Sequence, residues 1–142
     1  LMGNAVAKPL GTLHPNIAPY GELFTCADGG RIILAVGSDT QFAGLCRVLG
    51  LGHLAEDVRF CRNVDRVRNR STLASELAKH IATWPRRDLL KALLQAEVPA
   101  GALNDIEAAL ATPAAQHMIV EQEIEGTLTR RVRGNAFRIE GY

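Results

Sequence analysis

The residues best suited to contacting a ligand are concentrated in the segment 11–20, where an imidazole, an amide and a phenol stand among prolines. A proline fixes its own φ, removes a backbone N–H and pushes the preceding residue towards extended geometry, so Pro15 and Pro19 predict a stiff loop. Such a loop can hold backbone donors against a ligand, and glycine lets the backbone approach closely. A domain linker stiffened by prolines is an equally good interpretation. The candidate ligand-contacting residues are Gly11, His14, Pro15, Asn16 and Tyr20.

A run of arginines is the second feature with a chemical use. Guanidinium groups match the geometry of phosphate oxygens, which makes Arg66 and Arg70 candidate phosphate contacts. The interpretation we favour is a solvated face whose charges pair with neighbouring carboxylates. Nucleic acid is a poor fit, because aromatic residues make up only 5% of the chain and the formal net charge is +1. The run comprises Arg59, Arg62, Arg66, Arg68 and Arg70, and the neighbouring acids are Glu56, Asp57 and Asp65.

Other groupings of reactive residues predict no site. The 3 cysteines and 4 histidines lack the close pairs typical of zinc ligands, so we expect no metal site. No serine or cysteine stands in a nucleophile motif, so we expect no catalytic residue in this chain. Gly50 and Gly52 match part of a dinucleotide-binding fingerprint, but a helix is expected before them where the fingerprint needs a strand. We therefore predict a helix end and a turn there, and a place in the core for Cys46.

Composition indicates an ordinary globular domain. The chain has 142 residues, of which 47% are hydrophobic and 22% charged. We assign residues 1–10 to a linker or the tail of a preceding element, and residues 11–142 to one domain. No apolar run is long enough to span a bilayer, and no signal peptide is visible. An odd number of widely spaced cysteines suggests a reducing compartment, so we expect a cytoplasmic protein that binds neither membrane nor nucleic acid.

The elements that must position these residues begin and end with β-hairpins. Residues 23–26 and 31–36 are expected to be strands, and the turn at 28–30 contains glycines that can adopt positive φ. Near the other end of the chain, residues 127–132 and 136–139 are expected to be a second pair of strands, joined by a turn at 133–135. The hairpins should flank a helical middle, which gives an α+β fold.

The first helix of the middle should begin at Ser38. Ser38 and Gln41 have capping-box spacing, Asp39 is an acid in the first turn, and Gly50 can end the helix in a left-handed conformation. Its buried stripe should comprise Phe42, Leu45, Cys46 and Leu49.

The later elements follow from caps and periodicity. We expect a helix from Asn63 or Asp65, a helix capped by Thr83 with Pro85 in its first turn, a strand over 99–103, a short helix from Asn104 or Asp105 to Ala111, and a helix from Pro113 towards Ile124. The inner face of the helix from Asn63 or Asp65 should comprise Val67, Ala74, Leu77, Ala78 and Ile81. The inner face of the helix after Thr83 should comprise Trp84, Leu89, Leu90, Leu93 and Leu94.

In their order and spacing, these motifs resemble the family III CoA-transferases, which include formyl-CoA transferase, the carnitine CoA-transferases and the α-methylacyl-CoA racemases. The family pattern is Gly-x-x-His-Pro followed by Pro-Tyr, an Asp-Gly hairpin, an acid before Gln-Phe, then Arg-Phe, Asn-Arg and Val-Pro-Ala-Gly. The match runs from Lys8 to Ile139. The matching residues are Gly11, His14, Pro15, Pro19, Tyr20, Asp28, Gly29, Ala35, Val36, Gly37, Asp39, Gln41, Phe42, Arg59, Phe60, Asn63, Arg66, Val67, Asn69, Arg70, Leu73 and 98–101.

The resemblance implies that this chain is a small domain inserted beside a larger Rossmann-like domain, which carries an aspartate nucleophile. Such enzymes move CoA from an acyl-CoA to an acceptor carboxylic acid through covalent aspartyl intermediates. The racemase branch instead uses acid–base chemistry. The implied substrates are acyl-CoA and a carboxylic acid, the implied assembly is a homodimer, and no cofactor is bound permanently. Because the nucleophile lies elsewhere, the chain alone should be inactive. A free-standing α+β binding module is the alternative from another class.

Within that resemblance, the small domain closes the active-site cleft. The place of the glycine-rich lid of formyl-CoA transferase is taken here by residues 11–16, which contain one glycine and look closer to the His-Pro loop of the carnitine-type members. Asp39 is the nearest counterpart of an acid that helps to close the racemase site. Arg66 and Arg70 would then be contacts for the ADP-phosphate end of CoA.

Overall fold

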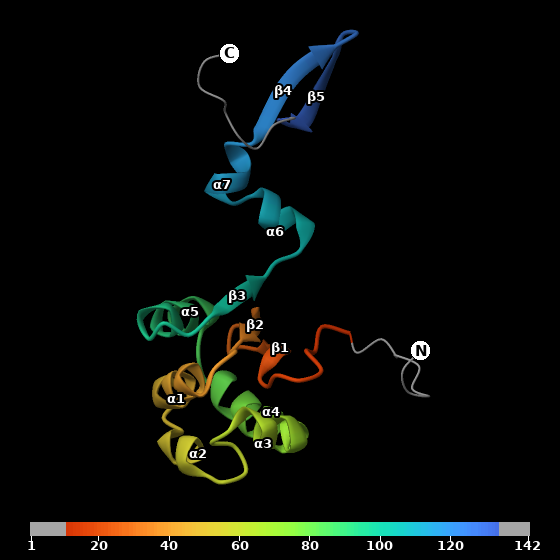
Figure 1. Ribbon diagram of the computed structural model, residues 1–142. Helices are drawn as coiled ribbons and strands as arrows, with labels where there is room; N and C mark the ends of the chain where they lie inside the picture. Colours follow the sequence, from red (N-terminus) through yellow and green to blue (C-terminus); the bar gives the residue numbers. More distant parts are fainter. Residues whose placement is uncertain (1–10, 134–142) are drawn as a thin grey trace, which may run out of the picture. The chain divides into compact units, whose positions relative to one another are not determined.

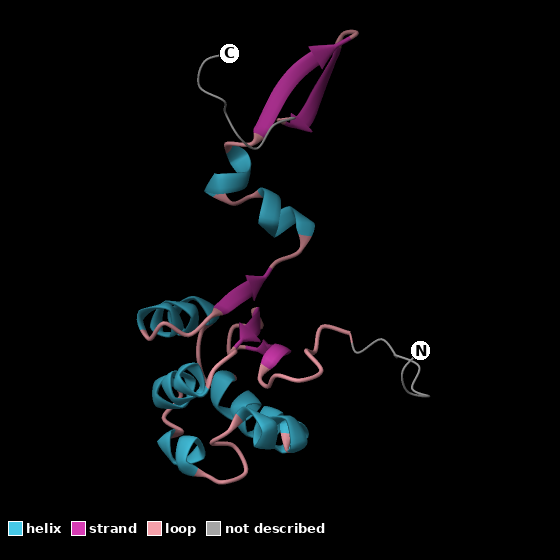
Figure 2. Ribbon diagram, viewed as in Figure 1, coloured by secondary structure: helices cyan, strands magenta, loops and turns pink. Residues whose placement is uncertain are grey.

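The computed structural model of the protein describes residues 11–133. Its contacts divide the chain into two units, Leu1–Leu103 and Asn104–Tyr142. The first unit contains β1–β3 and α1–α5, and the second contains α6, α7, β4 and β5 (Figure 1). Antiparallel hairpins and a helical middle confirm the predicted α+β fold (Figure 2). No helix within the described range is long and apolar enough to cross a membrane.

The sheet of the first unit has the strand order β1-β2-β3. β1 (Tyr20–Thr25) pairs antiparallel with β2 (Arg31–Ala35), which pairs antiparallel with β3 (Ala100–Leu103). The hairpin turn is as predicted, because Gly29 takes a φ of +75°. β1 starts earlier than expected, at Tyr20, so the strand follows the loop 11–20 without an intervening segment.

The first helix also matches its prediction. α1 (Asp39–Val48) has the full capping box: the Ser38 hydroxyl accepts the Gln41 N–H, and the Gln41 side chain accepts the Ser38 N–H at 3.2 Å. Gly50, with a φ of +70°, ends the helix before α2 (Gly52–Glu56) begins. Gly50 is therefore a helix end, as predicted, whereas Gly52 is the first residue of a short helix and not part of a turn.

Two boundaries in the helical middle differ from the prediction. The second helix is divided at Asn69 into α3 (Asn63–Arg68) and α4 (Arg70–Ile81). The Asn69 amide donates to the carbonyls of Arg59 and Asp65, which stabilises the interruption.

α5 (Arg86–Gln95) follows Pro85, and the prediction that Thr83 caps it is wrong. The Thr83 hydroxyl donates to the His80 carbonyl at the end of α4. The N–H of Arg86 is instead accepted by Asp28 from the β1–β2 turn, at 3.1 Å.

The hydrophobic core of the first unit lies between the sheet and the helices. The predicted stripe of α1 is buried, whereas Ala78 is exposed and Leu94 is 77% exposed, both contrary to expectation. The buried core residues are Phe24, Cys26, Ile32, Leu34, Val36, Phe42, Leu45, Cys46, Leu49, Leu51, Leu54, Phe60, Leu73, Leu77, Ile81, Leu89, Leu93 and Val98.

The second unit consists of α6 (Ile106–Leu110), capped by Asp105, α7 (Pro113–Gln116), and a hairpin of β4 (Ile119–Ile124) and β5 (Thr127–Val132). The predicted helix from Pro113 therefore ends early. The predicted strand 127–132 is present, but it pairs with β4. The other predicted strand, 136–139, lies outside the described residues.

The second unit has no buried residue between positions 104 and 133. Ile106 is 80% exposed and Leu128 is 68% exposed. A two-stranded hairpin is marginally stable alone in water, and these described elements supply no core of their own.

Candidate functional site

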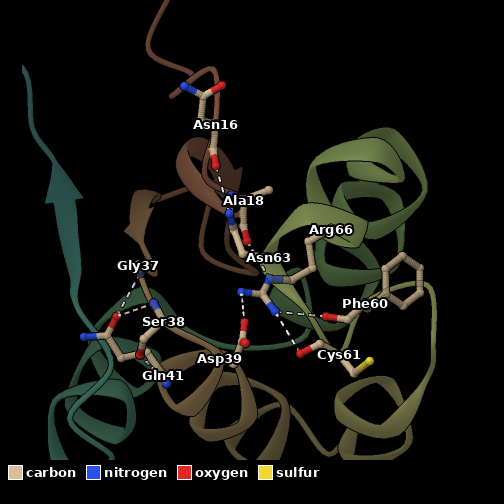
Figure 3. A network of polar contacts seen from close by, with 10 residues as sticks. All are labelled: Asn16, Ala18, Gly37, Ser38, Asp39, Gln41, Phe60, Cys61, Asn63 and Arg66. Atoms are coloured by element: carbon tan, nitrogen blue, oxygen red, sulfur yellow. Dashed lines mark hydrogen bonds and ion pairs between the residues drawn. The ribbon is translucent and has the colours of Figure 1, made fainter.

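The loop 11–20 is tied to the body of the first unit by side chains from α3 and α4. Asn63, the first residue of α3, makes two of these contacts (Figure 3). Its amide nitrogen donates to the Asn16 carbonyl at 2.8 Å, and its amide oxygen accepts the Ala18 N–H at 3.1 Å. Both polar atoms of one side chain are thus used to hold the loop backbone.

Arg66 is fully buried beneath the loop. Its Nε donates to the Ala18 carbonyl at 2.7 Å, and one terminal nitrogen donates to the Phe60 carbonyl at 3.0 Å (Figure 3). The other terminal nitrogen pairs with Asp39 at 2.7 Å, and the guanidinium lies over the Phe42 ring at 4.5 Å from its centroid. One side chain therefore joins the loop, the α2–α3 connection and the first turn of α1.

Arg70, at the start of α4, holds the other part of the loop. It donates to the carbonyls of His14 at 2.6 Å and Ile17 at 2.8 Å. It also forms an ion pair of 2.7 Å with Glu22, a buried acid in β1. The second carboxylate oxygen of Glu22 is buried without a hydrogen-bond partner among the described residues. The loop, β1 and α4 are therefore connected through one guanidinium.

Within the loop, His14 is fixed by its neighbours. Its backbone N–H donates to the Tyr20 carbonyl at 2.9 Å. Its ring stands edge-on to the Tyr20 ring, with the ring centroids 5.5 Å apart. The Nδ1 atom accepts the N–H of Asn16 at 3.1 Å. His14 is half-buried, while Gly11, Pro15 and Asn16 are exposed.

Gly21 is a loop-supporting residue that sequence reasoning did not identify. Its φ is +87°, and a Cβ at this position would collide with the carbonyl oxygen of Thr12. The Thr12 hydroxyl also donates to the Gly21 carbonyl at 2.7 Å. The two backbone segments cross so closely that only glycine fits.

The structure brings the candidate residues together through their supports. His14, Asn16 and Tyr20 are in one anchored loop, and Asp39 reaches that loop through Arg66. The sequence did not identify Asn63 and Glu22 as residues that support this loop. Glu22 lies before the strand expected at 23–26, so nothing in the sequence indicated that its carboxylate would be buried and paired.

The solvated-face interpretation of the arginine run holds for part of the run. Arg59 pairs with Asp57 at 2.6 Å and Arg68 with Asp65 at 3.4 Å, both at the surface. It is wrong for Arg66, which lies in the interior. Phosphate contact by Arg66 and Arg70 stays a prediction, and the geometry gives both guanidinium groups internal partners.

The strong surface pair of Arg59 and Asp57 affects the titration of the acid. Hydrogen bonds from the Arg59 side chain, followed by one from its backbone, lower the pKa of Asp57 to about 2. A lowered carboxyl pKa contributes stability above the unfolded-state pKa, and that contribution disappears as the pH falls through the folded-state value.

We therefore expect Asp57→Asn to flatten the fall in the free energy of unfolding between about pH 4 and pH 2, since the variant has no carboxyl to protonate there. Urea unfolding midpoints over this pH range measure the effect. Arg59→Gln should flatten the same window by removing the partner. An unchanged pH slope in both variants would contradict the assignment.

The two buried cysteines, Cys26 and Cys46, are poorly suited to act as nucleophiles, and the described residues contain no metal-binding cluster. Burial raises the pKa of the Cys46 thiol to about 11, and burial also raises the pKa of Cys26. A thiol that resists ionisation is a poor nucleophile. Between residues 11 and 133, no cluster of three or more His, Cys, Asp or Glu side chains could hold a metal ion.

Comparison with known proteins places this arrangement in a family. The family model described as CoA-transferase family III matches residues 1–141. The succinate–glutarate CoA-transferase of Agrobacterium fabrum is 41% identical over 127 residues, covering 87% of this chain and 31% of that protein. The acetyl-CoA:oxalate CoA-transferase of Acetobacter aceti is 34% identical over 142 residues, covering 99% of this chain and 34% of that protein.

A solved structure gives the same result. A crystal structure of a CaiB/BaiF family protein from Brucella suis matches with a TM-score of 0.81 and 36% identity, covering 96% of this chain and 35% of that one. The chain thus spans about a third of the length of the relatives it matches. The resemblance seen in the sequence is confirmed, and the chain belongs to family III of the CoA-transferases.

Proposed function

We propose that this chain is the small domain of a longer enzyme that transfers CoA from an acyl-CoA to a short dicarboxylic acid. The observation that carries the proposal is the similarity, over most of the chain, to CoA-transferases named for succinate and glutarate and for oxalate. The loop 11–20 is the part of this domain that faces the reacting groups. Gly11, His14, Pro15, Asn16 and Tyr20 are its proposed contacts, with Asp39 supporting them from α1.

The chemistry of this proposal uses an aspartate in the remainder of the polypeptide. Its carboxylate attacks the thioester carbon, the carbon–sulfur bond breaks, and CoA leaves as a thiolate. The thiolate attacks the aspartyl carbonyl, which releases the acyl group as a carboxylate and leaves an aspartyl-CoA thioester. The acceptor carboxylate then displaces the thiolate from this thioester. The thiolate attacks the acceptor carbonyl, so that acceptor-CoA forms and the aspartate is regenerated.

The contribution of the small domain is to shape the cleft with a preorganised loop. Asn63, Arg66 and Arg70 hold the carbonyls of four loop residues, with Asn63 also accepting a backbone N–H. Because the loop is ordered by the fold, little ordering entropy is lost when substrate binds. The proposed enzyme is a cytoplasmic homodimer without a permanently bound cofactor, and the chain of 142 residues alone is inactive.

The test is a CoA-transfer assay on the full polypeptide that contains this sequence. Purified enzyme is incubated with succinyl-CoA and either glutarate or oxalate, and the CoA esters are separated by chromatography. We expect the CoA thioester of the acceptor acid to form with the full polypeptide and not with residues 1–142 alone. Racemisation of a 2-methylacyl-CoA without any CoA transfer, or no reaction with any of these acids, would overturn the proposal.

A further inference from the structure

We infer that His14 is held as its Nε2–H tautomer and donates this N–H to a carboxylate oxygen of the substrate. The tautomer follows from the geometry of the loop alone. The identity of the ligand rests on the proposed function. The two parts of the inference are therefore tested by separate measurements.

The tautomer is set by a backbone donor. The N–H of Asn16 points to Nδ1 of His14 at 3.1 Å, so Nδ1 acts as the acceptor. In a neutral imidazole one ring nitrogen accepts and the other carries the proton, which places the proton on Nε2. The exposed Asn16 N–H would otherwise bond to water, so the hydrogen bond to Nδ1 replaces a protein–water hydrogen bond.

The ring is held in this orientation from several sides. The backbone of His14 is fixed on both sides, by its N–H bond to Tyr20 and by the Arg70 bond to its carbonyl. The carbonyl of Asn16, the residue that supplies the donor, is held by Asn63. The ring itself packs edge-on against Tyr20. Flipping the imidazole would remove the acceptor from the Asn16 N–H.

The other ring nitrogen has no hydrogen-bond partner in the part of the chain that the structure describes. Within residues 11–133 no hydrogen bond involves Nε2 of His14, and the side chain is only half-buried. The adjacent Tyr20 is 38% exposed and carries a second potential donor, its phenolic hydroxyl. Two donors on touching rings at the surface of a stiff loop form a small site for an oxygen ligand.

Carboxylate suits these donors better than phosphate does. Guanidinium groups bind both anions, but a phosphate ester carries a charge of up to about −2 and gains more from a free cation than a carboxylate does. Arg70, which contacts the loop, is instead paired with Glu22 and with loop carbonyls, and Arg66 is buried. What remains at the surface of the loop is uncharged N–H and O–H. Such donors can bind a carboxylate, or the oxygen of its thioester, without the strong attraction of a cation that would retain the product.

The tautomer can be measured on this chain labelled with ¹⁵N-histidine. Long-range ¹H–¹⁵N spectra distinguish a protonated from an unprotonated ring nitrogen, and loss of one ring system in His14→Gln assigns His14 among the 4 histidines. We expect Nε2 protonated and Nδ1 unprotonated and hydrogen-bonded. Asn16→Pro, which has no N–H, should shift the Nδ1 resonance. An Nδ1–H tautomer in the unmodified chain would overturn the first part of the inference.

The ligand is tested in the full enzyme with two replacements that separate the two ring nitrogens. His14→Asn keeps a polar group near the position of Nδ1 but has no donor at the position of Nε2, whereas the amide of His14→Gln reaches that position. We expect His14→Asn to lower kcat/KM for the acceptor acid by about 10- to 100-fold, as a lost hydrogen bond to a charged group does. His14→Gln should restore much of this loss. His53→Asn, at an exposed position of α2, is the matched control.

Each outcome has a defined meaning. Equal losses in both His14 variants would indicate a packing role and overturn carboxylate binding, as would unchanged kinetics in both. If the unmodified enzyme transfers no CoA at all, the proposed function and the ligand assignment fail together. The NMR result on the tautomer would still stand or fall by itself.

Discussion

Arg66→Ala should lower the free energy of unfolding of the chain by about 3–5 kcal/mol. The substitution leaves the carbonyls of Ala18 and Phe60 without their donor in a buried position, and each such loss costs about 1–3 kcal/mol. It also removes a side chain packed over the Phe42 ring, which leaves a cavity. The loss of the Asp39 pair adds little, because the Asp39 side chain is 57% exposed and water replaces the partner.

Urea unfolding monitored by circular dichroism measures this effect. Arg68→Ala is the matched control, since Arg68 is two residues away in α3 and its side chain is 73% exposed. We expect this control to change stability by less than about 0.5 kcal/mol. Asp39→Asn should cost less than about 1 kcal/mol. If Arg66→Ala were no more harmful than Arg68→Ala, the network beneath the loop would not contribute to stability.

The second large effect is expected at Gly21. In Gly21→Ala the new methyl group meets the Thr12 carbonyl oxygen, and the φ of +87° is unfavourable for alanine. The positive φ alone costs about 1–2 kcal/mol. Relief of the collision additionally requires the loop to move away from β1. We therefore expect a loss of about 3 kcal/mol or more in stability, together with loss of CoA transfer in the full enzyme.

Gly29→Ala separates the two causes. Gly29 has a similar φ of +75°, but a Cβ there has no heavy atom within 4 Å. This control should show the conformational cost alone, about 1–2 kcal/mol. Thermal melting of both variants and a transfer assay on the full enzyme provide the comparison. Equal destabilisation in the two variants would mean that the loop does not cross β1 as closely as the structure shows.

Much of the fold was predictable where local chemistry decides the outcome. The capping box of Ser38 and Gln41, the helix end at Gly50 and the turn at Gly29 all depend on residues close in sequence. These features need one cap or one positive φ, and few residue types provide them. The same local chemistry applies to α6, for which Asn104 and Asp105 were both possible caps and Asp105 is the one observed.

The errors arose where distant residues or competing propensities decide. Residues 117–124 were assigned to a helix, but Ile119, Val120 and Ile124 are β-branched and favour a strand once Glu125 and Gly126 form a tight turn with positive φ. Thr83 has a side chain that can cap a helix, which is why it was predicted to cap α5. Asp28 takes that role from 58 positions away along the chain, which no local pattern can indicate.

The candidate loop was recognised from its prolines and its polar residues, but its supports were not. Arg66 occurs in a series of arginines in which its neighbours Arg59 and Arg68 are at the surface, so its type and spacing give no sign of burial. The three-way contact with Ala18, Phe60 and Asp39 exists only after the helices have packed. A buried charge of this kind is visible only in the folded arrangement.

The anchoring of the loop has a consequence for the order of folding. Its bonds to Asn63, Arg66 and Arg70 join positions 45 to 56 residues apart. Closing so long a segment of chain costs entropy that is recovered only when the partners are in place. The loop should therefore acquire its conformation late, after α3 and α4 have docked, and its amide protons should exchange with solvent through a smaller opening than the one that exposes the two helices.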